Sequence, residues 1–357
     1  MKKTELLTAI KAVMMGIDKG SAIGSDFLLF DENWVRSFKE DISVSFPLET
    51  KIRTAVRAEE LYKILGKLSG DELEIELAQG GGVPDKLIVT SGKTTIKMNP
   101  LQKEQTTASL EKAWAVQTDD LEWFFLPKGF QEGLELCSFS AGVGAALGAL
   151  AGVHFLKNNA ISTDNFRVSV YTMEEEVPDK FTIPTRVVEN LIRLGVTFES
   201  IALSKAWVHF SNKEGAIFSS RILAGEYPSD KILGLFKTMK FDMGEIAREF
   251  PKGLEAPLER AKILAGAEVD GWESLSQIAL SYSNGHLNIQ ASKEAGEIID
   301  QIEWPENHIE EDIELKVQPD FFKKILGITR QFRMSPTKKS LLFSSDKFKH
   351  LMVATLK

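Results

Sequence analysis

The sequence predicts an α+β protein built from three similar domains in tandem, and two repeated signatures support this prediction. The first is Pro-Lys-Gly followed by an apolar residue, with Leu-Glu a few positions later, and it begins at Pro127 and again at Pro251. Moving towards the N-terminus by the distance between Pro127 and Pro251 reaches the start of the chain. There Leu6 and Ile10 occupy the places of the two apolar residues of the signature. Small stacked repeats have periods of roughly 20 to 50 residues, so this longer period indicates whole domains.

The second signature is an amphipathic helix in the middle of each domain, over residues 57–65, 184–192 and 318–326. Apolar residues recur at three aligned positions on one helix face. These are Leu61, Val188 and Phe322, then Ile64, Leu191 and Ile325, then Leu65, Ile192 and Leu326. In the 357-residue chain, we place the domains at residues 1–116, 117–238 and 239–357.

Each domain is expected to open with another amphipathic helix. Thr4 is the expected N-cap of the first such helix. Pro127 and Pro251 are expected in the first turns of the other two, where proline is favoured. Pro257 should kink the third helix or delay its start, because proline lacks a backbone N–H.

Alternating apolar residues separated by turn signals predict antiparallel strands in every domain. In domain one the strands are expected at 73–77, 87–90 and 94–98, with turns at 80–85 and 91–93. Domain two is expected to repeat them at 200–203, 206–210 and 216–219. Domain three is expected to do so at 278–281, 287–290, 297–300, 341–343 and 351–353.

Composition describes an ordinary globular protein, with 43% hydrophobic and 26% charged residues. The net charge of −8 argues against general affinity for polyanions. A single cysteine cannot form an internal disulfide, which fits a reducing compartment such as the cytoplasm. The uncharged run from Ser140 to Phe155 is too short and too weakly apolar to span a membrane, and no targeting segment is evident.

Several segments resemble one family. Ser162 to Val168 is similar to the segment A-T-D-G-H-R-L of the bacterial DNA polymerase III beta subunit, the sliding clamp. Further similarities to this family lie at Phe181 to Pro184, Ser219 to Pro228 and Arg260 to Leu264. Asn165 and Phe166 replace the family's Gly and His, residues 353–357 depart from its usual ending, and the Gly/Ala-rich stretch at 140–153 replaces a more polar segment. The chain is therefore identified as a divergent member, with a chromosomal or a phage origin left open.

The resemblance implies three tandem clamp domains and a head-to-tail homodimer that closes into a ring. Such a ring encircles duplex DNA without reading its sequence. It tethers the replicative DNA polymerase and other replication and repair proteins, and a clamp loader places it on DNA. The implied location is the cytoplasm, or the host cytoplasm if the protein is phage-encoded. No cofactor and no catalytic activity of its own are implied.

The lining of the ring is expected to be basic, so that it meets phosphates without binding tightly. The alternative is that these side chains only solvate the surfaces of their helices. The candidate DNA-facing residues are Lys11, Lys63, Lys67, Lys128, Arg186, Arg193, Lys252, Arg260, Lys323, Lys324 and Arg330.

The resemblance also implies a cleft between domains two and three that binds peptides of partner proteins. The alternative is that its apolar members are ordinary core or strand residues. The matching residues are His154, Thr163, Asn165, Phe166, Arg167, Val168, Pro228, Ile232, Leu233, Ser340, Leu351, Met352, Val353, Ala354, Thr355 and Leu356.

The dimer contact implied by the resemblance packs Ile263 and Leu264 of one chain against Ile96 and Met98 of the other. The last two residues belong to an expected edge strand, and an apolar edge strand needs cover.

Other motifs give no sign of catalysis or metal binding. Ser91 to Thr94 contains the Gly-Lys-Thr of a phosphate loop, but Leu87 occupies the place of the required earlier glycine. Cys137 falls on the apolar face of its helix, and the five histidines are not spaced as a metal site. Two other classes stay open beside the clamp: a clamp-like adaptor that binds proteins without encircling DNA, and an enzyme on an unrelated α+β fold.

Overall fold

The computed structural model describes residues 1–17, 26–80, 83–116, 118, 120–194, 197–238, 248–265, 277–305, 313–335 and 339–354. For residues 79–80, 83–84, 145, 193–194 and 313 it describes the backbone alone. In this described part, no helix combines the length and the apolar composition that a membrane crossing requires.

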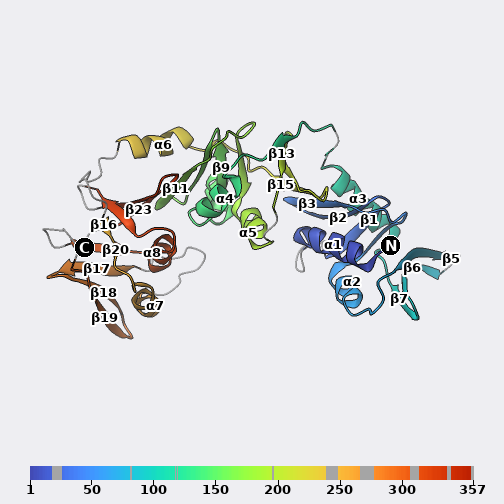
Figure 1. Cartoon of the computed structure of the whole chain (residues 1–357), viewed down its shortest axis with the longest axis horizontal. Coiled ribbons are helices and arrows are strands. Elements are labelled where there is room, and N and C mark those ends of the chain that lie inside the picture. The colour runs from blue at the N-terminus through green and yellow to red at the C-terminus, as the bar shows by residue number, and fades with distance from the viewer. Residues whose placement is uncertain are drawn as a thin grey trace. The chain divides into compact units, whose positions relative to one another are not determined.

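The order of elements repeats three times along the described residues, as a helix, four strands, a second helix and three strands (Figure 1). The first copy is α1 (Lys3–Val13), β1 (Phe27–Asp31), β2 (Trp34–Lys39), β3 (Ile42–Pro47), β4 (Arg53–Arg57), α2 (Ala58–Leu65), β5 (Glu74–Gly80), β6 (Val83–Ser91) and β7 (Thr94–Met98). The second is α4 (Phe130–Ser138), β9 (Gly152–Leu156), β10 (Asn159–Thr163), β11 (Arg167–Thr172), β12 (Phe181–Pro184), α5 (Thr185–Leu194), β13 (Ser200–Leu203), β14 (Trp207–Ser211) and β15 (Ile217–Arg221). The third is α7 (Glu255–Ile263), β17 (Ile278–Ser283), β18 (His286–Lys293), β19 (Gly296–Glu303), β20 (Ile313–Val317), α8 (Pro319–Leu326), β21 (Gln331–Met334), β22 (Ser340–Ser344) and β23 (Phe348–Val353).

Further elements lie outside this repeat. They are the 3-10 turns η1 (Met14–Gly16) and η2 (Ala145–Leu150), the helices α3 (Lys103–Trp114) and α6 (Ser229–Thr238), and the short strands β8 (Phe124–Phe125) and β16 (Arg248–Glu249).

The chain packs into two compact units. Unit 1 comprises Met1–Leu126 and Val177–Leu223, and unit 2 comprises Pro127–Glu176 and Ala224–Lys357. The α+β class is confirmed by this mixture of helices and antiparallel strands. The boundaries at 116/117 and 238/239 stay a prediction.

Unit 1 is centred on an eight-stranded sheet in the order β4-β1-β2-β3-β15-β14-β13-β8. Helix α1 packs on β2 and β3 and on α2, and it buries Leu6 and Ile10 completely. Helix α3 packs on β1, β2 and β4, where Leu110 and Ala113 meet Leu29. A second sheet has the order β5-β6-β7.

In unit 2 the strands of the larger sheet run β9-β10-β11-β23-β22-β21-β16, and a smaller sheet has the order β19-β18-β17-β20. Helix α4 packs on β9, β10 and β11, and α7 packs on α8, β18 and β19. Aromatic rings fill the core beneath α8. Phe250 contacts Phe322 edge-on at 4.9 Å and stacks on Phe332 at 4.1 Å.

The first helices of the three copies end in a similar way, with a side chain of the second strand donating to a carbonyl at the helix end. Ser37 Oγ donates to Val13 O at 2.5 Å, and Ser162 Oγ donates to Cys137 O at 2.5 Å. In the third copy Lys293 Nζ donates to Ile263 O at 2.7 Å. Helix ends leave carbonyls without intrahelical i to i+4 partners, so each side chain adds a hydrogen bond at the end of its helix.

The expected positions of Pro127 and Pro251 in first helical turns are wrong. Helix α4 begins at Phe130 and α7 at Glu255, because Gly129 and Gly253 have φ of +89° and +85°. A left-handed residue cannot belong to a right-handed helix, so each Pro-Lys-Gly forms a turn that precedes the helix. Helix α7 begins late, so Pro257 lies in its first turn, and the expected delay of the helix start is confirmed.

The expected N-cap at Thr4 is also wrong, since α1 begins at Lys3. Lys2 is the N-cap, and its backbone N–H donates to Glu5 Oε2 at 3.1 Å. The second helices, in contrast, begin within one residue of their expected positions.

Sequence analysis missed the helices α3 and α6 and many strands, among them β1 to β4, β10 to β12, β20 and β21. The strands β1 and β3 are buried over almost their whole length, so they lack the clean alternation by which the later strands were found.

Candidate functional site

An apolar cluster on one face of the larger sheet of unit 2 brings together part of the expected cleft. It consists of Ile161, Val168, Val170, Tyr227, Ile232, Leu342 and Leu351, and we call it the apolar cluster. Val168 pairs with Leu351, and Leu351 pairs with Leu342, so these three side chains share a sheet face. The expected residues Val168, Ile232 and Leu351 are therefore neighbours, and Leu233 packs against them.

His154 and Thr163 lie on the same sheet face as the apolar cluster. His154 pairs with Ile161 and Thr163 with Val168, so register places them there. The His154 ring stacks on Tyr227 with 4.5 Å between ring centroids and 3° between ring planes. Burial raises the pKa of the Tyr227 hydroxyl above its usual value.

Helix α6 brings the remaining apolar side chains to the cluster. Ile232 is buried in it, and Leu233 and Phe236 pack against it. The expected residue Pro228 is half-buried just before the helix, and its carbonyl accepts the Ile232 N–H at 3.1 Å. Sequence reasoning missed Ile161, Val170, Tyr227, Phe236 and Leu342. Of these, Leu342 carried a signal, because it lies in the expected strand at 341–343.

The corresponding three sheet positions in unit 1 are polar. Ser43 pairs with Ser219, which pairs with His209, at the sheet positions that Val168, Leu351 and Leu342 occupy in unit 2. His209 Nδ1 and the Ser219 hydroxyl are hydrogen-bonded at 2.8 Å. The same three strand positions are thus apolar in unit 2 and polar in unit 1.

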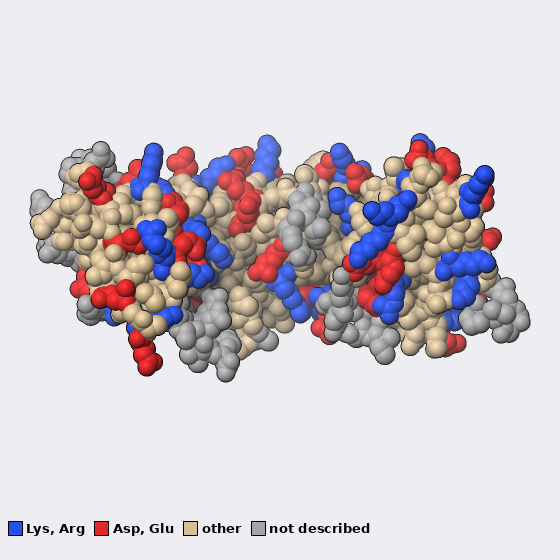
Figure 2. All heavy atoms as spheres, turned by 90° about the horizontal axis from the view of Figure 1, so that it is seen from below, with Lys and Arg blue, Asp and Glu red and all other residues tan. Residues whose placement is uncertain are grey.

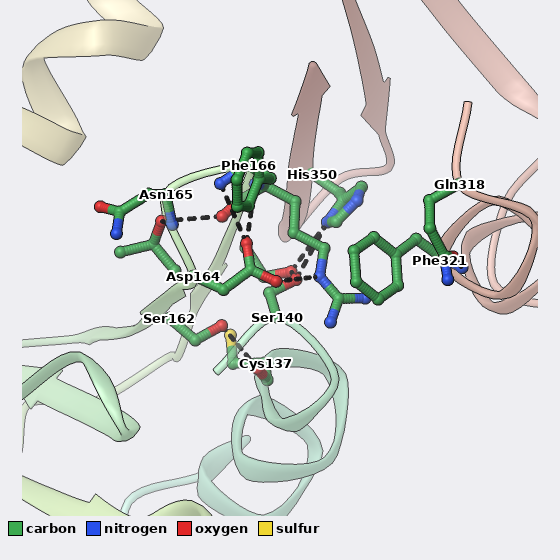
Figure 3. Close-up of polar contacts among 12 residues, drawn as sticks. Cys137, Ser140, Ser162, Asp164, Asn165, Phe166, Gln318, Phe321 and His350 are labelled. Carbon is green, nitrogen blue, oxygen red and sulfur yellow. Dashed lines mark hydrogen bonds and ion pairs between the residues drawn. The ribbon is translucent and has the colours of Figure 1, made fainter. Parts of the chain in front are cut away.

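The turn from Thr163 to Arg167 is held by its own side chains (Figure 3). Asp164 Oδ1 accepts the backbone N–H groups of Phe166 and Arg167, each at 3.0 Å. Thr163 Oγ1 accepts the Asn165 N–H at 3.1 Å and donates to Arg167 O at 2.8 Å. Asn165 has a φ of +75°, a left-handed conformation that Asn tolerates, so it replaces the family's glycine without losing the turn.

Phe166 and Val353 form the exposed rim beside the apolar cluster. Phe166 is 42% exposed and Val353 45% exposed, and the Val353 N–H donates to Phe166 O at 2.9 Å. Ser340 pairs with Val353, and the Ala354 N–H donates to Lys339 O at 2.9 Å. The expected cleft residues Thr355 and Leu356 lie outside the described residues.

Arg167 and Met352 point to the other face of the sheet. They pair with each other, one position along from Val168 and Leu351, so alternation turns them away from the apolar cluster. Arg167 is 6% exposed, and its Nε pairs with Asp164 Oδ2 at 2.8 Å. Its guanidinium carbon lies 3.2 Å from the ring centroid of Phe321 on α8.

A buried hydroxyl-imidazole group lies on the same sheet face as Arg167, because Ser169 follows Arg167 by two positions and pairs with His350. Figure 3 shows His350 and Ser140 of this group. His350 Nδ1 is 2.9 Å from Ser169 Oγ and 3.4 Å from Ser140 Oγ, and the two hydroxyls are 2.7 Å apart. Burial, with a smaller contribution from the Arg167 charge, lowers the pKa of His350 to about 3. The imidazole is therefore neutral at physiological pH and acts as a packing group.

The segment from Gly142 to Leu150 adds apolar contacts to the cluster. Ala149 and Leu150 pack against it, and the Gly142 N–H donates to Leu150 O at 2.9 Å. Gly144 and Gly148 have φ of +100° and +54°, conformations that favour glycine. The Gly/Ala-rich composition of this segment thus serves a tightly turned loop.

Several expected DNA-facing residues are ion-paired, and of these Lys323 and Arg330 are half-buried while the others are exposed. Lys63 pairs with Glu59 at 2.6 Å and Arg260 with Asp300 at 2.9 Å. The other ion pairs join Arg186 to Asp41, Lys323 to Glu259, and Arg330 to Glu255. On the face drawn in Figure 2, Lys and Arg side chains are interspersed with Asp and Glu side chains.

Lys11, Lys67, Lys128, Lys252 and Lys324 are exposed as well. The side chain of Arg193 lies outside the described residues. Arg330 also donates to Pro251 O at 2.5 Å, which fixes the turn before α7.

The four residues of the expected dimer contact lie at or near two sheet edges. Ile96 and Met98 are half-buried on β7, the edge of the β5-β6-β7 sheet. Ile263, at the end of α7, is 70% exposed, and Leu264 beside it is half-buried. Helix α7 packs on β19, the edge of the second sheet of unit 2.

The chemistry of the described residues gives no sign of a catalytic or metal centre. No group of three or more His, Cys, Asp or Glu side chains among them could hold a metal ion. Cys137 is fully buried with Phe130 and Leu134, as expected, and burial raises the pKa of its thiol. Ser91 and Thr94 end and begin the strands of a hairpin, so Gly92-Lys93 is its turn.

Comparison with known proteins identifies the fold. No protein-family model and no curated protein matches the sequence. Among solved structures, a DNA polymerase sliding clamp from Pseudomonas aeruginosa matches with a TM-score of 0.73 and 18% identity, over 100% of this chain and 99% of that chain. The sliding clamp from Bacillus subtilis matches with a TM-score of 0.77 and 18% identity, over 100% and 98% of the two chains.

The DNA polymerase III beta subunit from Thermotoga maritima matches with a TM-score of 0.70 and 16% identity, again over 100% and 98%. The chain therefore has the fold of the bacterial sliding clamps over its whole length, at low sequence identity. The fold inferred from the sequence resemblance is confirmed.

Proposed function

We propose that this protein is a DNA sliding clamp, a non-catalytic ring that encircles duplex DNA and tethers a DNA polymerase to it. The observation that carries the proposal is the full-length match to sliding clamps, with the order of elements repeated three times. The partners are duplex DNA of any sequence, the replicative polymerase, other replication and repair proteins, and a clamp loader. The protein acts in the cytoplasm.

The proposed contact between the ring and DNA is weak. A ring stays on DNA because escape requires opening it, so it needs little affinity. Ion pairs such as Lys63–Glu59 and Arg260–Asp300 carry no net charge, and they support loose contact in a protein of net charge −8. Loose phosphate contacts suit sliding, and they weaken further as salt rises.

The proposed homodimer joins the edge strand β7 of one chain to the edge strand β19 of its partner. The charges of these edges are complementary, since Lys93 and Lys97 lie at β7 while Glu297 and Glu303 lie on β19. Ile299 on β19 is among the exposed large apolar residues. Pairing would cover two unprotected edges and bury their apolar side chains.

The proposed docking site for partner peptides is the apolar cluster with its rim, Phe166 and Val353. Exposed aromatic and aliphatic side chains beside a buried apolar floor suit an extended peptide that buries a few large side chains. Phe166, in place of the family's His, makes this rim less polar. The preferred peptide should therefore be more apolar than the common one, which carries Gln near its start and Leu-Phe at its end.

Primer extension tests the proposal. The replicative polymerase of the same host copies a long primed circle, with the clamp loader present, and product length per binding event is measured with and without this protein. A clamp should lengthen the products by orders of magnitude. An adaptor that binds the polymerase without encircling DNA would leave product length unchanged, which would contradict the proposal.

A further inference from the structure

The contact between Arg167 and Phe321 joins the docking rim to helix α8. Arg167 follows Phe166 directly, yet its side chain crosses to the opposite sheet face and is buried there at 6% exposure. Its guanidinium carbon lies 3.2 Å from the centroid of the Phe321 ring and 5.6 Å from that of Phe139. Aromatic faces thus receive a charge that is almost fully removed from water.

The other end of this contact is fixed by Asp164. Its Oδ2 accepts from Arg167 Nε at 2.8 Å, while its Oδ1 accepts the N–H groups of Phe166 and Arg167. One carboxylate therefore ties the guanidinium to the backbone that carries the rim. If the guanidinium moves, the hydrogen bonds that hold Phe166 must move with it.

Phe321 is itself held in place. Its backbone N–H donates to Gln318 Oε1 at 2.6 Å, which caps the N-terminus of α8, and Pro319 is the first residue of that helix (Figure 3). The adjacent Phe322 is fully buried and contacts Phe250 and Phe343. The ring under Arg167 is thus anchored to the core of unit 2.

We propose that Arg167 is a positioning residue that fixes the docking rim by seating its guanidinium on Phe321, so that α8 sets the position of Phe166. The residue does not contact a docked peptide, because the sheet lies between its guanidinium and the apolar cluster. This inference rests on the proposed docking function only for its effect on peptide affinity. Its effect on the turn is independent of that function.

The test replaces Phe321, which lies away from the apolar cluster. Phe321→Leu keeps an apolar side chain but removes the ring, whereas Phe321→Tyr keeps the ring. Phe332→Leu is the matched control, because it removes a buried ring of the same unit that stacks on Phe250. Amide hydrogen exchange at Phe166 and Arg167 reports on the turn directly, since both amides donate to Asp164.

The expected result is faster exchange at these two amides in Phe321→Leu, and wild-type exchange there in Phe321→Tyr and Phe332→Leu. A labelled synthetic peptide that ends in Leu-Phe and carries an apolar residue in place of the common Gln should bind Phe321→Leu about tenfold more weakly than wild type. Unchanged exchange in Phe321→Leu, or an equal increase in Phe332→Leu, would overturn the proposal. If wild type does not bind the peptide, the docking function fails, and the exchange comparison still decides the role of Arg167.

Discussion

At the scale of single residues, buried histidines make the stability of this protein sensitive to acid. Burial lowers the pKa of His350 to about 3 and that of His209 to about 4, from an ordinary value of 6.5. Below about pH 6.5 the unfolded chain binds protons at these positions while the folded chain does not. The free energy of unfolding must therefore fall as pH drops through this range towards the folded-state values.

His350→Leu should remove one of these contributions. Each buried histidine costs about 2 kcal/mol of stability at pH 5 relative to pH 7, from the difference between unfolded and folded pKa values. The variant should lose correspondingly less stability between these two pH values, measured by denaturant unfolding. The Ser140 and Ser169 hydroxyls remain 2.7 Å apart and can bond to each other. An equal loss in wild type and variant would show that His350 does not titrate as described.

Ser162 provides a second test at this scale. Its hydroxyl donates to Cys137 O in the buried core, where the Ser140 N–H also donates at 3.2 Å. Ser162→Ala therefore removes one of two buried hydrogen bonds to this carbonyl and should cost about 1 kcal/mol in unfolding free energy. Ser138→Ala is the matched control, because Ser138 makes an exposed bond to Glu135 O and should change stability by less than about 0.5 kcal/mol. Equal effects of the two substitutions would refute the role given to Ser162.

Much of the candidate site could be located from the sequence, but not which face of the sheet each of its residues occupies. The segment around Thr163 to Val168 was recognisable by its similarity to a family segment. That Arg167 points away from Val168 became evident only once the strand register was known, because adjacent strand residues face opposite sides. Tyr227 could not be singled out, since no local pattern shows that it stacks on a histidine far away in the sequence.

At the scale of elements, local periodicity predicted the second helices well and the helix starts poorly. Leu61, Val188 and Phe322 mark faces that are fully or almost fully buried, and such faces are visible in sequence. The start of α4 depends on the left-handed Gly129, which composition does not distinguish from a helical glycine. Strands buried on both faces, such as β3, give a continuous apolar signal that does not reveal their type.

The edges of the smaller sheets carry the prediction for assembly. Ile263→Asp should give monomers at micromolar concentration, because the side chain is 70% exposed in one chain and would be buried against β7 of its partner. Each interface should lose about 2 kcal/mol from the apolar contact, with the buried charge adding to the loss. Sedimentation of the variant measures this, and an unchanged circular dichroism spectrum shows that its chain still folds.

Ile64→Asp is the control for this variant. Ile64 is another partly exposed isoleucine, on α2 and away from both edge strands. The Ile64→Asp variant should therefore sediment as the wild type does. A wild-type protein that sediments as a monomer, or dissociation by both substitutions alike, would contradict the proposed interface.

At the scale of the whole molecule, the distribution of charge predicts weak binding to linear DNA. Binding to a short linear duplex should be independent of sequence and should fall steeply with salt. Lys11→Gln, Lys67→Gln, Lys252→Gln and Lys324→Gln together should reduce the salt dependence, measured as the slope of log affinity against log salt. An unchanged slope would mean that these exposed lysines do not meet phosphates.

The central claim is that two chains of this protein close around DNA. The measurement that tests it most directly is retention on circular DNA before and after a single cut. The protein is mixed with a circular duplex under dilution that dissociates the dimer, is then concentrated, and is washed in salt high enough to strip it from linear DNA. The account predicts that the protein stays on the intact circle through the wash and leaves once the circle is cut. Equal loss from intact and cut DNA would contradict it.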